Sequence, residues 1–248
     1  MTDVSTKKIA LITGGATGIG FAIAKKMSDD GLKVILVGRR QEALDKAVQL
    51  IGNDAVAIAA DVSLPADLAY LFSEVAERFG HLDVLVANAG FGVLAALGEI
   101  TEEQFDQQFA VNVKGVVFTL QSALPLLGKG SSVVIVGSTA SMDPGPGLSI
   151  YGATKAALRN LVRSWLSDLK GSGIRLNIVS PGPTNTESLR NMFGDNAADA
   201  LAFLNERSPI GRIGEPEEIA AVAAFLASDA ASYINGIELF ADGGASQV

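Results

Sequence analysis

Short apolar runs alternate along the chain with longer segments in which apolar residues recur every three or four positions. The runs are four to six residues long and end in glycine or polar residues, as strands buried on both faces do. This alternation predicts an α/β fold built on a doubly wound parallel sheet of about seven strands, with helices on both faces. The expected strands are Ile9–Ile12, Leu32–Val37, Ala55–Ala60, Leu82–Ala87, Val133–Val136, Ile174–Val179 and Ile237–Phe240.

The pattern runs through all 248 residues without a linker, a low-complexity segment or a short repeat. It therefore predicts a single domain, residues 1–248. Periodicity weakens only in residues 187–212, where glycine, asparagine and proline interrupt short apolar pieces. We expect this insertion to form a lid over the substrate. Its apolar residues are Leu189, Met192, Phe193, Leu201 and Phe203.

Composition narrows the possible functions. The 27 acidic and 19 basic residues give a net charge of −8, so we expect no nucleic-acid partner. The chain has no cysteine and a single histidine, His81, which leaves no cluster for a zinc site or a Ser-His-Asp triad. The first residues lack the pattern of a signal peptide, and no apolar run reaches the roughly 18 residues of a membrane-spanning helix. We expect a cytoplasmic protein without a metal ion or a membrane partner.

A glycine-rich turn follows the first predicted strand. Gly14, Gly18 and Gly20 lie between the apolar run and a segment of helical spacing. Glycines allow the backbone to approach a phosphate closely, and a helix N-terminus offers free amides and a positive dipole end. The spacing differs from the common G-x-G-x-x-G dinucleotide pattern. Two interpretations remain, a phosphate-binding turn and a tight turn without a ligand.

Arg39 and Arg40 follow the second predicted strand, at the point where an NAD-binding fold carries an acidic residue. A guanidinium can pair with a phosphate through two parallel hydrogen bonds, so two arginines here favour the 2′-phosphate of NADP. The alternative is a solvated arginine pair on a loop. We expect NADP(H) to be preferred and NAD(H) to be possible.

Five candidate ligand-binding residues fall at the ends of predicted strands. In doubly wound sheets ligands bind outside the carboxyl ends of the strands. We therefore expect these residues to lie along one edge of the sheet and to surround one ligand. They are Gly14, Arg39, Asp61, Asn88 and Ser138.

Tyr151 and Lys155 are four residues apart, so on a helix they share one face. A loop rich in proline and glycine, residues 139–150, can fold the hydroxyl of Ser138 back toward the phenol, and we expect this loop to line the substrate pocket. Asn112 interrupts the apolar stripe of a helix predicted over residues 105–118. A buried asparagine needs partners, so it is either a satisfied core amide or a kink that holds water.

In this order and spacing, the residues resemble the short-chain dehydrogenase/reductase family over nearly the whole chain. Each motif alone is common, but the ordered set is specific. The matching motifs are Thr13-Gly14-x-x-x-Gly18-x-Gly20, Asp61, Asn88-Ala89-Gly90, Asn112, Ser138, Tyr151-x-x-x-Lys155 and Pro181-Gly182. The chain is similar to the small single-domain branch, for which the resemblance implies a Rossmann-like fold and a homotetramer.

The resemblance also implies hydride transfer between a nicotinamide and a ketone or secondary alcohol. Tyr151 would be the acid/base, Ser138 would bond the substrate oxygen, and Asn112 would hold a water in a proton relay. Lys155 would bind the nicotinamide ribose and lower the pKa of Tyr151. An ammonium about 5 Å away contributes roughly 3 kcal/mol of the roughly 4 kcal/mol that a shift from about pH 10 to about pH 7 requires. The cofactor-binding residues would be Gly14, Thr17, Gly18, Ile19, Gly20, Arg39, Arg40, Asp61, Val62, Asn88, Ala89, Gly90, Tyr151, Lys155, Pro181, Gly182, Thr184 and Thr186.

Two other functions compete with this hypothesis of an NADP(H)-dependent reductase of simple ketones. A 3-oxoacyl-carrier-protein reductase would use the same chemistry but would need a basic patch for an acidic carrier. A nucleotide-binding sensor or scaffold would keep the fold and lose catalysis. Such a protein should have lost Ser138, Tyr151 or Lys155, and all three are present.

Overall fold

Seven parallel strands form one sheet in the order β3-β2-β1-β4-β5-β6-β7 in the computed structural model, which describes residues 7–247. All seven predicted strands are confirmed, with ends that differ by a few residues. The order turns back between β1 and β4, which is the switch point where doubly wound sheets bind ligands. The strands are β1 (Ile9–Thr13), β2 (Lys33–Gly38), β3 (Val56–Ala59), β4 (Leu82–Ala87), β5 (Leu127–Val136), β6 (Arg175–Pro181) and β7 (Glu238–Ala241).

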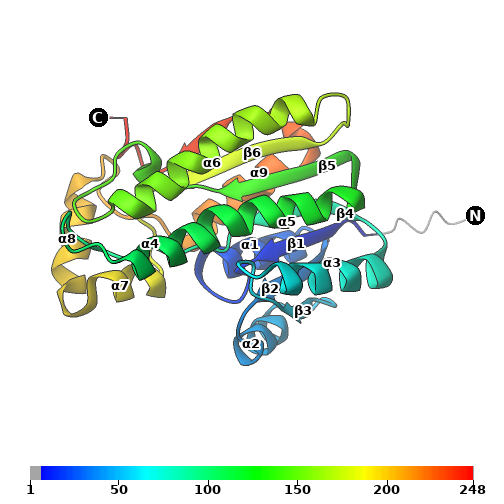
Figure 1. The fold of residues 1–248 in the computed structure, drawn as a ribbon, viewed down its shortest axis with the longest axis horizontal. Coiled ribbons are helices and arrows are strands. Elements are labelled where there is room, and N and C mark those ends of the chain that lie inside the picture. The colour runs from blue at the N-terminus through cyan, green and yellow to red at the C-terminus, as the bar shows by residue number, and fades with distance from the viewer. Residues whose placement is uncertain (1–6, 248) are drawn as a thin grey trace, which may run out of the picture.

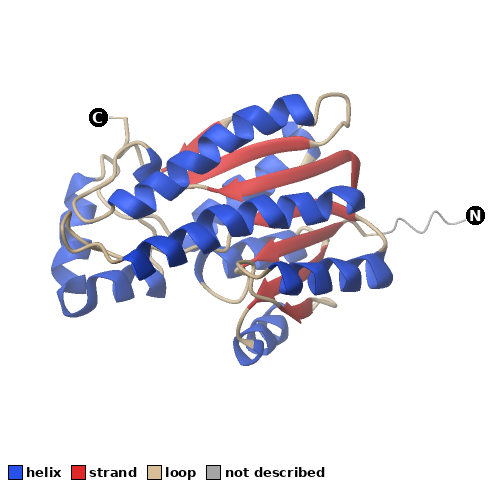
Figure 2. Ribbon diagram, viewed as in Figure 1, coloured by secondary structure: helices blue, strands red, loops and turns tan. Residues whose placement is uncertain are grey.

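Helices cover both faces of the sheet (Figures 1 and 2). Alternate side chains of each strand pack against opposite layers: Leu11 and Leu85 join α3, α5 and α6, whereas Ile12 and Val86 join α1, α2 and α9. Because the strands are buried on both faces of the sheet, they appear in the sequence as continuous apolar runs. The helices are α1 (Gly18–Asp29), α2 (Gln41–Ile51), α3 (Pro65–Phe79), α5 (Gly115–Ala123), α6 (Ser149–Asp168) and α9 (Pro216–Ala227).

The helix predicted over residues 105–118 is longer and contains a π-helical turn. It runs as α4 (Glu102–Phe109), the π turn η1 (Ala110–Lys114), α5 and the 3₁₀ turn η2 (Leu124–Leu126). It begins at Glu102 because Thr101 and Gln104 form a capping box. By length and composition this helix could span a membrane. It packs with one face against α3, α6 and β4, as a helix of the layer that covers the sheet does.

The weakly periodic segment forms two helices, α7 (Glu187–Phe193) and α8 (Ala197–Arg207), joined by the 3₁₀ turn η4 (Gly194–Asn196). Thr186 caps α7 by accepting a hydrogen bond from the Leu189 amide at 3.2 Å. Gly194 has a φ of 53°, which favours glycine at the break between the helices. Figure 1 shows α7 and α8 together beyond the carboxyl ends of the strands. This is the position expected of the lid.

Candidate active site

A cavity of about 560 Å³ opens at the carboxyl edge of the sheet, beneath α7 and α8. The five residues predicted to share this edge come from five different strand ends, and all of them line the cavity. They are Gly14, Arg39, Asp61, Asn88 and Ser138.

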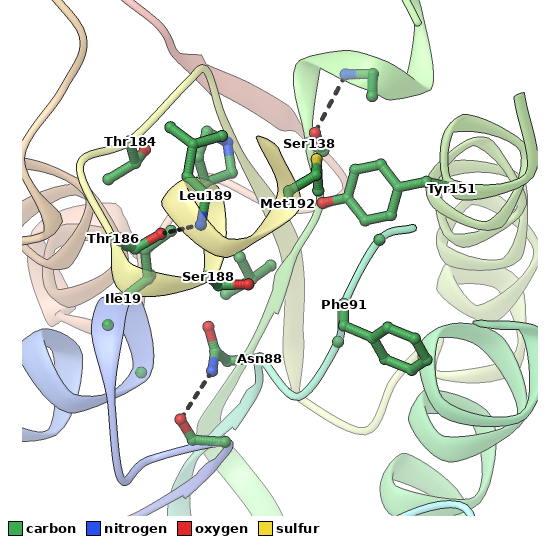
Figure 3. Close-up of a pocket in the computed structure, with 18 of the residues that line it drawn as sticks. Ile19, Asn88, Phe91, Ser138, Tyr151, Thr184, Thr186, Ser188, Leu189 and Met192 are labelled. Carbon is green, nitrogen blue, oxygen red and sulfur yellow. Dashed lines mark hydrogen bonds between the residues drawn. The ribbon is translucent and has the colours of Figure 1, made fainter. Parts of the chain in front are cut away.

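In the turn after β1, only glycine fits at position 20. A Cβ on Gly20 would lie 2.2 Å from the carbonyl oxygen of Gly14. Asn88 braces the turn by donating its Nδ2 to the Thr13 carbonyl at 2.9 Å and to the Gly14 carbonyl at 3.3 Å. Figure 3 shows Asn88 beside this turn. The Thr13 hydroxyl in turn accepts hydrogen bonds from the backbone amides of Asn88 and Ala89. The turn therefore holds bare backbone and the N-terminus of α1 against the cavity, an arrangement that fits a phosphate.

Arg39 and Arg40 follow β2, are exposed and line the same cavity. Asp61 lies beyond β3, where its Oδ1 accepts bonds from the amide and hydroxyl of Ser63 at 2.9 and 2.7 Å. The other predicted cofactor-binding residues also line the cavity. They are Thr17, Gly18, Ile19, Gly20, Val62, Ala89, Gly90, Tyr151, Lys155, Pro181, Gly182, Thr184 and Thr186.

Ser138, Tyr151 and Lys155 form the wall of the cavity between β5 and α6. Ser138 is the N-cap of the 3₁₀ turn η3 (Thr139–Ser141), and its Oγ accepts a hydrogen bond from the Ala140 amide at 3.2 Å. The Tyr151 ring points from α6 toward Ser138 (Figure 3). Lys155 is almost completely buried, and its Nζ donates to the carbonyl of Val136 at 2.9 Å. That nitrogen lies 5.7 Å from the centre of the Tyr151 ring.

Burial shifts the pKa of both ionisable groups in this wall. Burial raises the pKa of Tyr151, and the hydrogen bond from Ser138 to the phenol offsets part of that rise. Burial lowers the pKa of Lys155 to about 8. The direction at Tyr151 is opposite to the sequence-based expectation, because removal of the phenol from water is the largest effect on its pKa. The phenol is therefore protonated near neutral pH.

Asn112 is the exception among the predicted site residues, since it does not line the cavity. It is fully buried in the π turn, where its Oδ1 accepts the Phe91 amide at 3.0 Å. Its Nδ2 donates to the Phe91 carbonyl at 2.8 Å and to Thr154 Oγ1 at 3.1 Å. Of the two alternatives left open by the sequence, the structure shows a satisfied amide that also marks a helix irregularity. Its part in a water relay stays a prediction.

The half of the cavity that faces Tyr151 is largely apolar. A Cβ on Gly92 would lie 3.0 Å from the Tyr151 ring and 3.1 Å from Met192 Cε, so the backbone itself forms this wall. Sequence reasoning missed Phe91 and Gly92, although they directly follow the Asn88-Ala89-Gly90 motif. Of the expected lid residues, Leu201 and Phe203 do not line the cavity, and Phe203 is exposed. The apolar lining residues are Phe91, Leu148, Leu189, Met192, Phe193 and Leu204.

An ion pair joins α8 to the loop after Ser138. Arg207 at the end of α8 lies 3.4 Å from Asp143, and both residues line the cavity. The loop predicted to line the pocket also contributes Thr139, Ala140 and Leu148 to the wall. The ion pair was not apparent in the sequence, because it joins two residues 64 positions apart.

Known proteins share this sequence and architecture. A family model described as Enoyl-(Acyl carrier protein) reductase matches residues 14–246. Oxidoreductase asL5 of Sarocladium schorii is 45% identical over 245 residues, which cover 98% of this chain and 97% of the relative. The meso-2,3-butanediol dehydrogenase of Serratia marcescens is 39% identical over 241 residues, 96% of this chain and 94% of the relative.

Solved structures agree with these relatives. The crystal structure of a short chain dehydrogenase from Burkholderia cenocepacia in complex with NADP superposes with a TM-score of 0.88 at 38% identity, and the match covers 96% of this chain and 97% of the other. The fold, the ordered motifs and these likenesses agree over nearly the whole length. The chain is an oxidoreductase of the short-chain dehydrogenase/reductase family.

Proposed function

We propose that the protein transfers hydride between NADP(H) and a ketone or secondary alcohol, with Tyr151 as the acid/base. The observation that carries this proposal is that Ser138, Tyr151 and Lys155 share one cavity wall opposite the glycine turn and Arg39. The residues fit a nicotinamide dinucleotide, because the bare backbone of the turn and the N-terminus of α1 could hold its phosphates and the same cavity extends to Tyr151. When bound, the nicotinamide supplies or accepts the hydride.

The side chains of this wall supply the proton. A phenol with a raised pKa is neutral at pH 7 and can give its proton to a carbonyl oxygen as negative charge develops there. The Ser138 hydroxyl, held by the Ala140 amide, can donate a second hydrogen bond to the same oxygen. Lys155 lies against the ring and, in its charged form, stabilises the tyrosinate left after the transfer.

Substitution Tyr151→Phe tests the chemical role. It keeps the ring packed against Gly92 and removes only the hydroxyl, so we expect turnover to fall by at least about a thousandfold, within the range ascribed to acid–base catalysis, while NADPH still binds. The measurement is NADPH oxidation with a panel of ketones, beside NADPH titration by fluorescence. Near-normal turnover in the variant would refute the mechanism.

The preference for NADP(H) is a separate proposal that rests on Arg39 and Arg40. Replacing both with alanine should weaken NADPH binding by about ten- to a hundredfold and leave NADH binding within about threefold, because only NADPH carries the 2′-phosphate. Lys46→Ala is the matched control, since it removes an exposed positive charge from α2. Equal losses for both cofactors would show that the arginines are only surface charge.

We infer a small to medium, largely apolar substrate from apolar side chains that line the cavity, among them Phe91, Leu148, Leu189 and Met192. The alternative, an acyl group on a carrier protein, is favoured by the description of the matching family model. Against it, two arginines that line the cavity are already paired, Arg207 with Asp143 and Arg212 with Glu218. Comparing turnover of simple ketones with that of 3-oxoacyl-carrier protein separates the two. Oxidation of NADPH by any ketone also separates an enzyme from a non-catalytic sensor or scaffold.

A further inference from the structure

A buried polar cluster lies behind the wall that carries Ser138. Its members come from four elements: Ser141 from η3, Arg159 from α6, Ser180 from β6 and Glu238 from β7. Both serines are buried, and the side chain of Glu238 is 11% exposed. None of the four belongs to the family motifs or lines the cavity. Burying polar and charged groups costs free energy, so we looked for a role that this cluster serves.

Glu238 is the centre of the cluster. Its Oε1 accepts hydrogen bonds from Ser141 Oγ at 3.0 Å and from Ser180 Oγ at 2.7 Å. Its Oε2 lies 3.7 Å from Arg159 Nη1. Arg159 Nη2 also donates to the carbonyl of Ser141 at 3.1 Å. Both the side chain and the backbone of Ser141 are therefore fixed by the same ion pair.

These contacts hold the η3 turn from two sides. On the side of α6, a Cβ on Gly152 would lie 2.6 Å from the carbonyl of Ala140, so the turn rests directly on the residue after Tyr151. On the side of the sheet, a Cβ on Gly137 would lie 2.3 Å from Ser180 Oγ. The backbone on both sides of Ser138 thus packs closely against α6 and β6. Arg159 and Glu238 bond to Ser141 at the end of the turn and to Ser180 on β6.

The orientation of Ser138 depends on this turn, because its Oγ accepts the Ala140 amide inside it. Arg159 lies four residues after Lys155 on the helix that also carries Tyr151. The ion pair therefore joins the turn that orients the serine to the helix that orients the tyrosine and the lysine. A movement of the turn changes the distance between the Ser138 hydroxyl and the phenol.

We propose that Arg159 and Glu238 are positioning residues for catalysis, which hold the Ser138 hydroxyl in register with Tyr151 through the η3 turn. This inference rests on the proposed function, in which Ser138 and Tyr151 act on the carbonyl oxygen. It adds a requirement that the family motifs do not contain: an ion pair between α6 and the last strand.

The test separates positioning from stability. Arg159→Met keeps the aliphatic stem but leaves the Glu238 carboxylate buried and unpaired, which destabilises the fold by itself. The double variant Arg159→Met/Glu238→Gln removes that charge, and the glutamine oxygen still accepts both serine hydroxyls. Arg163→Met is the control, because Arg163 is exposed one turn further along α6.

For the double variant we expect kcat for ketone reduction to fall about tenfold, since small displacements of catalytic groups are costly. NADPH affinity should stay within about twofold and the melting temperature close to that of the unmodified protein, because a neutral pair replaces the charged one. Glu238→Gln alone, which keeps the arginine bond to Ser141, should retain more activity than Glu238→Ala. Arg163→Met should match the unmodified protein in all three measurements.

Unchanged kcat in the double variant would overturn the proposal and leave the cluster a purely stabilising one. A loss of NADPH affinity in step with kcat would also overturn it, because a general distortion then explains both. Tyr151→Phe in the same assay distinguishes a failure of the proposed chemistry from a failure of the positioning role. If that variant stays active, the proposed chemistry fails, whereas an inactive Tyr151→Phe beside a fully active double variant refutes only the positioning role.

Discussion

Lys155 is 5% exposed, and its ammonium has one protein acceptor, the carbonyl of Val136. Burial lowers its pKa to about 8, so the folded protein releases this proton well before the unfolded chain does. Between pH 8 and pH 10 the unfolded state binds more protons at this residue, and stability must rise with pH. Above about pH 10 the raised pKa of Tyr151 acts in the opposite direction, because the unfolded chain then ionises first.

The cofactor-free protein should therefore gain up to about 3 kcal/mol of unfolding free energy between pH 8 and pH 10, relative to Lys155→Met. Methionine has a similar length and no charge, so the difference between the two proteins isolates the lysine. Urea unfolding at half-unit steps of pH measures it. A difference that stays constant across this range would show that Lys155 keeps an ordinary proton affinity in the fold.

At the scale of elements, the helix from Glu102 to Leu126 holds the cavity wall through its π turn. Asn112 bonds both backbone groups of Phe91, so Asn112→Ala leaves a buried amide and carbonyl without partners. We expect a loss of about 2–4 kcal/mol of unfolding free energy. Gln107→Ala, on the exposed side of the same helix, should change it by less than about 0.5 kcal/mol. Denaturant titration compares them, and a loss below about 1 kcal/mol for Asn112→Ala would contradict the structural role.

Elements with a local sequence signal could be predicted. Elements that form through contacts between residues far apart in the chain could not. Each strand has its own apolar run, and the turn at Gly14 and Gly20 has its own glycines. The π turn forms where Asn112 meets Phe91, 21 residues away, which no local period reveals. The lid helices α7 and α8 contribute no residue to the two main apolar clusters, so their sequence lacks the strong stripe of a core helix.

At the scale of the whole molecule, the homotetramer implied by the family resemblance stays a prediction. The stripe from Leu158 to Leu169 packs in the chain's own core, where Leu158 and Val162 are buried. Phe105 and Phe118 remain exposed on the long helix. Light scattering should give four times the mass of one chain, and Phe118→Glu should lower it if this face is buried between subunits. The mass of a single chain for the unmodified protein would refute the prediction.

Most of the site could be predicted because the carboxyl ends of parallel strands lie at one edge of the sheet. Residues that follow different strands therefore lie close together although they are distant in sequence. Arg39 and Ser138 were placed by this rule. The contacts of Glu238 escaped it, since Ser141 and Ser180 lie 97 and 58 residues away and Glu238 lies inside a predicted strand rather than at its end. The direction of the Tyr151 pKa also escaped, because it depends on how much water the folded wall excludes.

The ion pair between Asp143 and Arg207 offers a way to watch the lid in solution. The chain contains no cysteine, so cysteines placed at these two positions would be the only thiols in the molecule. Fluorescent or spin labels attached there would sit on the loop after Ser138 and on the end of α8. Their separation would then report whether α8 moves relative to this loop during turnover, as a lid would.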